Sequence, residues 1–364
     1  MNKLLQFIRS DVQGMHAYAV QDSKGMVKLD AMENPFALSA ELQSLMGQRL
    51  GAVAVNRYPG SRVNDLSLAI KDYVNIPDGY ELMLGNGSDE LISLLAMACL
   101  TRKDKPNAKI LAPEPGFVMY AMSAQLQGLD FVGVPLTTEF ELDEAAMLTA
   151  IKGHQPALTY IAYPNNPTAN LSNADTIRSI IKACAAYGGI VVMDEAYQPF
   201  SSSTWLDEIR AKPSENENVL LMRTLSKFGL AGVRLGYMLG VKTLMDEINK
   251  LRPPYNVSSL NAECALFALE HKDVFAEQAA IIKSERTRLF ESLMAIKGVT
   301  PFKSDANMIL VRFPNADATF AQLKADGVLV KNVSKMHPLL ANCLRLTVGT
   351  PKENDLLLKS LNNN

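Results

Sequence analysis

Short apolar segments alternate with longer amphipathic segments between about residues 80 and 240, and this alternation restricts the possible folds more than any other feature of the chain. The apolar segments have the length and composition of buried strands. We expect strands at Glu81–Leu84, Lys109–Ala112, Phe131–Pro135, Leu158–Ala162, Ile190–Asp194, Val219–Arg223 and Leu235–Leu239. Strands that alternate with helices form a mostly parallel sheet with helices on both faces. We therefore predict an α/β fold around a mostly parallel, seven-stranded sheet.

The pattern changes after about residue 253, where two long helical segments, Ser259–His271 and Asp273–Ile296, precede a mixture of short strands and helices. A chain of 364 residues is long enough for two domains. We expect a large domain at residues 29–253 and a smaller α+β domain at residues 254–364. An N-terminal arm at residues 1–28 is expected to belong with the smaller domain.

The composition excludes several classes of function. The formal net charge is −2 and no basic stripe is present, so binding to nucleic acid or to an anionic membrane is not expected. The longest mostly apolar run, Leu91–Leu100, is too short to span a membrane, and Met1–Met15 mixes charges unlike a signal peptide. The four cysteines are scattered and the four histidines lack ligand spacing. This pattern predicts reduced thiols, no metal site and a cytoplasmic location.

Lys227 is the residue most suggestive of chemistry. It follows a predicted strand, Ser226 lies beside it, and Arg234 follows seven residues later in a glycine-rich loop. A lysine that forms a Schiff base needs a rigid position and neighbours that tune its pKa. Serine and arginine are suited to bind a phosphate. The segment therefore predicts a lysine that holds pyridoxal phosphate, whereas the alternative is an ordinary surface lysine.

The predicted strand Ile190–Asp194 ends in a carboxylate. Asp194 is placed to pair with a protonated pyridine nitrogen, and Tyr197 to hydrogen-bond the phenolic oxygen of the same ring. An apolar strand that ends in Asp-Glu is also typical of Mg²⁺ binding in nucleotide hydrolases. The sequence lacks the G-x-x-x-x-G-K-[ST] loop that such enzymes require. A purely structural acid at the strand end is the other alternative.

Two more loops at predicted strand ends contribute to this site, because ligands of parallel sheets bind at the carboxyl ends of strands. Gly85–Glu90 opens a helix whose free amides near Ser88 and Asp89 favour a single phosphate, although helix capping alone would explain these residues too. In Tyr163–Thr168 two prolines stiffen the loop, so that the Asn166 amide is placed to donate to the ring oxygen. An ordinary turn is the alternative there.

Two further residues are candidates for ligand contacts. Tyr120, or Phe117 as the alternative, follows another strand and is expected to stack on a planar ring, unless both merely pack in the core. Arg345 lies inside the apolar segment Cys343–Gly349, where a guanidinium is costly unless it is paired. It is expected to bind a substrate carboxylate or phosphate, or else to form a structural salt bridge.

Together these motifs resemble the fold-type I pyridoxal-phosphate-dependent aminotransferases, and among them the histidinol-phosphate aminotransferase family. The resemblance covers most of the chain. It rests on Leu29–Pro35, Arg57–Gly60, Gly87–Glu90, Tyr163–Thr168, Asp194–Tyr197, Arg223–Arg234 and Leu344–Gly349. It implies a reversible transamination of L-histidinol phosphate with 2-oxoglutarate, as in histidine biosynthesis. Alternatives are an aromatic amino-acid aminotransferase or a phospho-amino-acid decarboxylase of the same fold; a non-catalytic regulator is disfavoured because no room remains for a DNA-binding module.

The resemblance also assigns roles to residues. It implies that Lys227 binds the cofactor covalently and then carries a proton, and that Tyr58 reaches the phosphate from a partner subunit in a homodimer. Arg345 would bind the α-carboxylate of glutamate or the phosphate of histidinol phosphate, and Tyr18 would cover the substrate. Lys331 stands where the family carries a second phosphate-binding arginine, and lysine lacks the bidentate fork of arginine.

Overall fold

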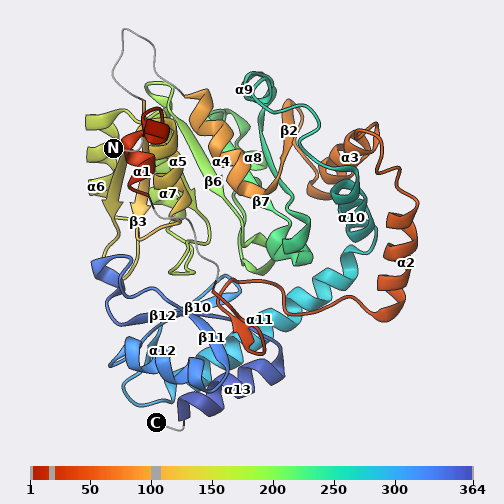
Figure 1. The fold of residues 1–364 in the computed structure, drawn as a ribbon. Helices are drawn as coiled ribbons and strands as arrows, with labels where there is room; N and C mark the ends of the chain where they lie inside the picture. The colour runs from red at the N-terminus through yellow and green to blue at the C-terminus, as the bar shows by residue number, and fades with distance from the viewer. Residues whose placement is uncertain (1–2, 16–20, 100–107, 363–364) are drawn as a thin grey trace.

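Two β-sheets organise the chain in the computed structural model, which describes residues 3–15, 21–99 and 108–362 (Figure 1). The larger sheet has seven strands in the order β2-β8-β7-β6-β5-β3-β4. Its strands are β2 (Tyr80–Gly85), β3 (Lys109–Glu114), β4 (Asp130–Pro135), β5 (Leu158–Ala162), β6 (Ile190–Asp194), β7 (Val219–Thr224) and β8 (Gly236–Val241). The seven predicted strands are confirmed, with every end within two residues of its predicted position.

Strand β8 is the one antiparallel element of this sheet. It pairs antiparallel with both β2 and β7, whereas the pairs from β7 through β6, β5 and β3 to β4 are parallel. The strand β2 therefore runs in the same direction as β7, although the two are not neighbours. As a result, the carboxyl ends of β2 and of the five parallel strands meet at one edge of the sheet.

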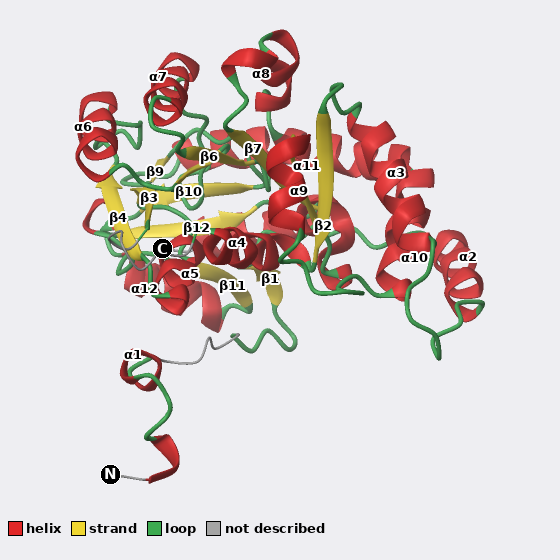
Figure 2. Cartoon of the chain, turned by 90° about the horizontal axis from the view of Figure 1, so that it is seen from above, coloured by secondary structure: helices red, strands yellow, loops and turns green. Residues whose placement is uncertain are grey.

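Helices cover both faces of the large sheet, as predicted (Figure 2). The helices of one layer are α4 (Gly87–Ala98), α5 (Met119–Gln127) and α9 (Lys242–Asn249). Those of the other layer are α3 (Arg62–Val74), α6 (Glu144–His154), α7 (Ala174–Ala185), α8 (Trp205–Ala211) and α10 (Ser259–Glu270). Successive side chains of a strand point to opposite faces of the sheet and so contribute to both cores. Val192 packs against the first layer, and Val191 and Met193 pack against the second. This two-sided burial explains why the strands are continuously apolar.

The smaller sheet has the strand order β1-β11-β12-β10-β9. Its strands are β1 (Val27–Leu29), β9 (Thr300–Pro301), β10 (Met308–Arg312), β11 (Val328–Asn332) and β12 (Cys343–Thr347). The helices α11 (Lys272–Met294), α12 (Ala316–Ala325) and α13 (Pro351–Asn362) share its apolar core. The sheet thus combines the C-terminal part of the chain with a strand from the N-terminal part, beside the large domain (Figure 1).

The packing of α10 bears on the domain boundary. This helix contacts α3 and α2 (Ala40–Gly51) of the large domain, whereas α11 extends into the small domain. We therefore propose a boundary near His271, between α10 and α11, in place of the boundary expected after residue 253. On the N-terminal side, β1 pairs with β11, so the small domain includes Leu29.

The N-terminal arm approaches the large domain rather than the small one. Arg9, just before α1 (Ser10–Gln13), donates hydrogen bonds to the carbonyl oxygens of Gln125 and Leu126 at the end of α5. Figure 2 shows α1 standing away from the main body of the chain. Tyr18 lies outside the described residues.

The four cysteines are free thiols, and Cys184 and Cys343 are buried. Burial raises the pKa of Cys99 to about 11, so its thiol is protonated at neutral pH. Within residues 3–15, 21–99 and 108–362, no helix has both the length and the apolar character needed to cross a bilayer.

Candidate active site

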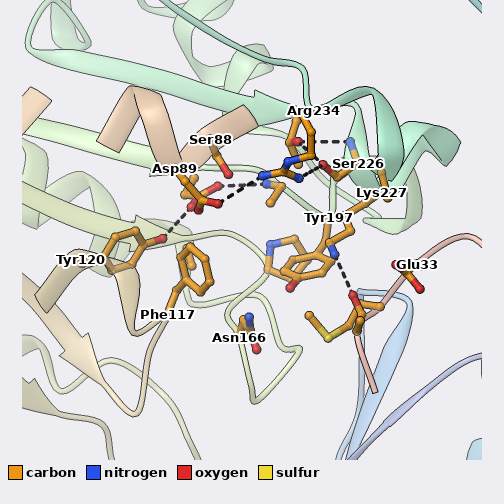
Figure 3. Close-up of a pocket in the computed structure, with 18 of the residues that line it drawn as sticks. Glu33, Ser88, Asp89, Phe117, Tyr120, Asn166, Tyr197, Ser226, Lys227 and Arg234 are labelled. Carbon is orange, nitrogen blue, oxygen red and sulfur yellow. Dashed lines mark hydrogen bonds and ion pairs between the residues drawn. The ribbon is translucent and has the colours of Figure 1, made fainter. Parts of the chain in front are cut away.

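A cavity of about 310 Å³ lies where the parallel strands of the large sheet end (Figure 3). Its walls include most of the residues that the sequence singled out. They are Ser88, Asp89, Tyr120, Asn166, Asp194, Tyr197, Ser226, Lys227 and Arg234. These residues follow different strands and meet because the carboxyl ends of those strands share one edge.

Lys227 lies in a wide helical turn (η4, Ser226–Leu230) that begins two residues after β7. Gly229 in this turn has φ +141°, and a Cβ atom there would come within 2.8 Å of the Phe275 ring. Glycine therefore allows the turn to pack against α11. The Lys227 Nζ donates a hydrogen bond of 2.9 Å to the Ala31 carbonyl oxygen. A half-buried amine held in this way faces the cavity in one defined position.

The surroundings of Lys227 favour its neutral form. Burial, supported by the nearby cations Arg345 and Arg234, lowers the pKa of Lys227 from 10.5 to about 8. A neutral amine is the form that attacks a carbonyl carbon or accepts a proton. At pH 7 about a tenth of Lys227 is therefore neutral, far more than for a lysine with the ordinary pKa of 10.5.

This depressed pKa gives the expected binding of pyridoxal phosphate by Lys227 a defined pH dependence. The neutral fraction of Lys227 increases as the pH rises through about 8, instead of 10.5 for an ordinary lysine. The rate of covalent incorporation of added pyridoxal phosphate should follow the same curve, measured by stopped-flow absorbance. In an Arg345→Ala variant the midpoint should move upward, because one nearby cation is lost. A wild-type midpoint close to 10 would contradict the assignment of Lys227 as the acceptor.

Asp194 forms the floor of the cavity at the end of β6. One carboxylate oxygen, Oδ2, accepts a hydrogen bond of 2.7 Å from the Tyr120 hydroxyl, and Oδ1 accepts one of 3.1 Å from the Ala196 amide. Burial raises the pKa of Asp194 to about 6, and the two hydrogen bonds oppose this rise. The group is therefore mostly ionised at neutral pH and presents a buried negative charge to a basic nitrogen.

Tyr120 does not have the position that we expected for a stacking residue. Its ring stacks on Tyr160 with centroids 4.3 Å apart, its hydroxyl binds Asp194, and only 2% of its surface is exposed. Phe117 meets the edge of Tyr120 and also lines the cavity. Figure 3 shows Phe117 on the cavity side of Tyr120. The reason is that Tyr120 points from α5 into the core, whereas Phe117 precedes the helix, so the alternative Phe117 fits the stacking role better.

The other end of the cavity is suited to an anion. Gly87 opens α4 with φ +76°, and its ideal Cβ position lies 3.0 Å from the Arg234 guanidinium. A Cβ on Gly236 would come within 2.8 Å of the Gly87 backbone, so two glycines allow this close approach. The Arg234 guanidinium donates to Ser226 Oγ at 3.4 Å and pairs with Asp89 at 3.3 Å. The helix start, the hydroxyl and the guanidinium together form a cradle for a phosphate.

Arg345 connects the small domain to the cavity wall. Its Nη1 donates to Asn166 Oδ1 at 2.8 Å, and its Nη2 donates to the Asp30 carbonyl oxygen at 2.7 Å. Because Asn166 uses its oxygen in this way, its NH₂ group is available to donate into the cavity. Lys331 lies directly opposite Arg345 in the pairing of β11 with β12, so both side chains leave the same face of that sheet. Neither is part of the cavity wall.

Tyr58 lies elsewhere on the same chain. Its ring is 79% exposed and stacks on Tyr255 with centroids 4.6 Å apart. The two rings border a surface hollow of about 570 Å³ that is separate from the cavity of Lys227. Tyr58 therefore does not line the cavity of its own chain.

Three contributors to the site were missed by the sequence interpretation. Thr224 donates to Ser226 Oγ at 3.0 Å and so positions that hydroxyl. Asn34 donates to the Phe228 carbonyl oxygen at 3.3 Å and thereby supports the turn of Lys227. The third is the Ala31 carbonyl oxygen, a backbone atom for which no side-chain pattern exists. Thr224 and Asn34 both lie in motifs that carried the resemblance, which was the signal that could have identified them.

The order of groups along the cavity fits one kind of ligand. A flat ring with a basic nitrogen toward Asp194 and a phosphate toward Arg234 would place its remaining polar atoms near Asn166, Tyr197 and Lys227. Pyridoxal phosphate has this arrangement of groups, so the residues present fit the cofactor that the resemblance implies.

The fold and this site define an aminotransferase, and the chain belongs to the class I and II aminotransferase family, whose model matches residues 24–361. It is 62% identical over 359 residues to the histidinol-phosphate aminotransferase of Methylibium petroleiphilum, and the alignment covers 99% of this chain and 95% of that protein. It is also 62% identical to the histidinol-phosphate aminotransferase of Polaromonas naphthalenivorans, with 99% and 96% covered. The crystal structure of histidinol-phosphate aminotransferase from Sinorhizobium meliloti with pyridoxal 5′-phosphate shares the fold, with a TM-score of 0.83, 22% identity and 98% and 97% covered.

Proposed function

We propose that the protein is a histidinol-phosphate aminotransferase, which exchanges the amino group of L-histidinol phosphate with 2-oxoglutarate and uses pyridoxal phosphate. The observation that carries the proposal is the half-buried Lys227 amine, with a lowered pKa, in the same cavity as Asp194 and the Arg234 cradle. The high identity to relatives of that name over almost the whole chain supports the choice of substrate. A cytoplasmic location remains our prediction.

Each residue of the cavity has a distinct task in this proposal. When bound, pyridoxal phosphate supplies a ring that withdraws electrons from the α-carbon of the substrate. Lys227 would hold the cofactor covalently, and as a neutral amine it would take the proton from the α-carbon of the substrate. Asp194 keeps the ring nitrogen protonated, and Asn166 and Tyr197 hydrogen-bond the ring oxygen.

The remaining residues hold the cofactor in place. The amides near Ser88 and Asp89, the Ser226 hydroxyl and the Arg234 guanidinium bind its phosphate. Phe117 packs against its ring, because an aromatic side chain at the wall of the cavity stabilises a planar group by stacking.

We propose that Arg345 binds the anionic end of each substrate. Only 8% of Arg345 is exposed, and its hydrogen bonds to Asn166 and Asp30 leave the guanidinium beside the cavity. Lys331 lies opposite it in the register and would add positive charge for the substrate phosphate.

Replacement of Arg345 by alanine should lower kcat/KM for both glutamate and histidinol phosphate by about 100-fold or more, because truncation of a buried charge leaves its anionic partner unpaired. Steady-state kinetics with both substrates measures this loss. The matched control is Arg312→Ala, on the adjacent strand β10, which should leave both KM values unchanged. Unchanged kinetics for Arg345→Ala would give this residue a purely structural role.

We propose a homodimer in which Tyr58 completes the site of the partner subunit. The support is the exposed, stacked pair Tyr58 and Tyr255 beside a surface hollow, since exposed aromatic patches of this kind mark interaction surfaces.

A mixture of two inactive subunits tests this arrangement. Lys227→Ala subunits and Tyr58→Ala subunits should each be impaired alone. After denaturation and joint refolding, mixed dimers should regain activity, because one of their two sites combines an intact Lys227 with an intact Tyr58 from the other chain. Absence of recovery, with mixed dimers demonstrated by mass spectrometry, would mean that Tyr58 does not act across the interface.

The choice among the related activities is tested by an amino-donor panel. L-Histidinol phosphate, phenylalanine, tyrosine and threonine phosphate are compared by the spectral change of the bound cofactor and by kcat/KM. Histidinol phosphate should give the highest kcat/KM and no carbon dioxide. A preference for phenylalanine or tyrosine would indicate an aromatic aminotransferase, and release of carbon dioxide from threonine phosphate would indicate a decarboxylase.

A further inference from the structure

The Tyr120 hydroxyl binds the carboxylate that is proposed to pair with the cofactor. Asp194 Oδ1 is occupied by the Ala196 amide, and Oδ2 accepts from the Tyr120 hydroxyl at 2.7 Å. The hydroxyl therefore fixes the oxygen that the backbone leaves free. We propose that Tyr120 is a positioning residue that keeps the Asp194 carboxylate ionised and oriented toward the ring nitrogen of the cofactor, an inference that rests on the proposed function.

The Tyr120 side chain has the rigidity that this task requires. Its ring stacks on Tyr160 at an interplanar angle of 14° and meets Phe117 edge-on with centroids 5.6 Å apart. It lies in the apolar core between α5 and the sheet. A phenol held between two aromatic rings donates its hydrogen bond in one fixed direction. The Asp194 carboxylate therefore cannot rotate without losing this bond.

The electrostatic contribution has a definite sign. Burial raises the pKa of Asp194, and the Tyr120 hydrogen bond is the largest effect that lowers it. A carboxylate and a ring nitrogen that face each other share one proton, and the stronger base keeps it. Without the phenol, Asp194 is a stronger base than in the wild type. The shared proton therefore moves from the ring nitrogen toward Asp194. The ring then withdraws electrons less well.

The test compares two buried tyrosines that differ in one contact. Tyr120→Phe removes the hydroxyl that binds Asp194, whereas Tyr160→Phe removes the hydroxyl of the ring stacked on it, for which no partner occurs in the described part of the chain. Each variant is loaded with ¹⁵N-labelled pyridoxal phosphate. The ¹⁵N chemical shift of the ring nitrogen then reports its protonation directly, and kcat and KM are measured in parallel.

In Tyr120→Phe the ring nitrogen signal should move toward that of a neutral pyridine, and kcat should fall about tenfold or more with a smaller change in KM. Tyr160→Phe should resemble the wild type in both measurements. As a second, size-preserving change, 3-fluorotyrosine at position 120 is a stronger donor and should move the signal in the opposite direction. This measurement keeps the proposal testable if Tyr120→Phe does not fold.

The possible failures can be told apart. If the wild type binds the cofactor but Tyr120→Phe and Tyr160→Phe give the same nitrogen signal and the same kcat, the positioning role is wrong and the proposed function stands. A fluorotyrosine signal identical to that of the wild type would overturn the role in the same way. If the wild type does not bind pyridoxal phosphate, the proposed function and this inference fall together.

Discussion

Replacement of Lys227 by alanine should lower kcat for transamination by about four orders of magnitude or more, because the covalent attachment of the cofactor and the base that moves the proton are lost together. The amine is half-buried, lines the cavity and has a pKa of about 8. The phosphate cradle around Arg234 is untouched by this change, so some pyridoxal phosphate should still bind without a covalent bond. Stopped-flow and steady-state assays measure the loss of turnover, and dialysis measures the retained cofactor.

Borohydride reduction gives a separate check of the attachment site. In the wild type it should fix the cofactor to the peptide that contains Lys227, as determined by mass spectrometry. Lys242→Ala, which changes an exposed lysine after β8, is the matched control and should keep full turnover and full labelling. Labelling of another lysine, or normal turnover in Lys227→Ala, would remove Lys227 from its assigned role.

The substitution Asp194→Asn should lower kcat by roughly two to three orders of magnitude, since a preorganised charge next to the reacting system is replaced by a neutral amide. The amide cannot keep the ring nitrogen protonated in the way a carboxylate does. The visible absorption of the bound cofactor and its ring nitrogen chemical shift should change with kcat. Wild-type activity in this variant would rule out the pairing of Asp194 with the ring nitrogen.

The same substitution should stabilise the protein without its cofactor. The pKa of Asp194 is raised from 3.8 to about 6 by burial, so the folded state holds the proton more tightly than the unfolded state. Stability is therefore lost as the pH rises from about 4 to 6, and the cost above pH 6 is roughly 3 kcal/mol. Apo Asp194→Asn should unfold at a higher temperature than the wild-type apoenzyme at pH 7.5, and the difference should shrink below pH 4. A lower unfolding temperature at pH 7.5 would show that Asp194 is not destabilising.

The charge on Asp194 therefore destabilises the protein without its cofactor but is needed for catalysis. A buried carboxylate is unfavourable in the empty site and becomes useful only when a cation-bearing ring is present. Tyr120 reduces the cost by donating to it. We expect that binding of the cofactor removes the remaining penalty, so the holoenzyme should be less sensitive than the apoenzyme to pH between 4 and 6.

The sequence predicted the large sheet well because the pattern of its strands is local. The inner strands, such as β5 and β7, are buried on both faces, so they are short and continuously apolar, and polar loop residues mark their ends. The edge strand β4 is only partly buried. The segments around Asn166, Asp194 and Lys227 could be placed at strand ends for this reason, and the common direction of the strands brought them together.

Other features could not be predicted because they depend on contacts between distant segments. The insertion of β8 antiparallel between β2 and β7 brings Gly87 against Arg234, and nothing local in either segment specifies it. The boundary that we propose near His271 depends on such a contact too, since the sequence predicts α10 as a helix in either domain and its packing against α3 favours the large one.

The sequence by itself determined the family, the strands of the large sheet and the chemical types of the groups at their ends, because these follow from local periodicity and from motifs a few residues long. Only the tertiary structure decided how the two aromatic residues Phe117 and Tyr120, which both line the cavity, are oriented. They are three residues apart, but the packing of α5 stacks the Tyr120 ring on Tyr160 and directs its hydroxyl to Asp194, whereas Phe117 precedes the helix. It likewise decided that Arg345 reaches Asn166 across 179 positions of sequence. Burial and hydrogen bonding between distant segments fix such choices, and they exist only after the chain has folded.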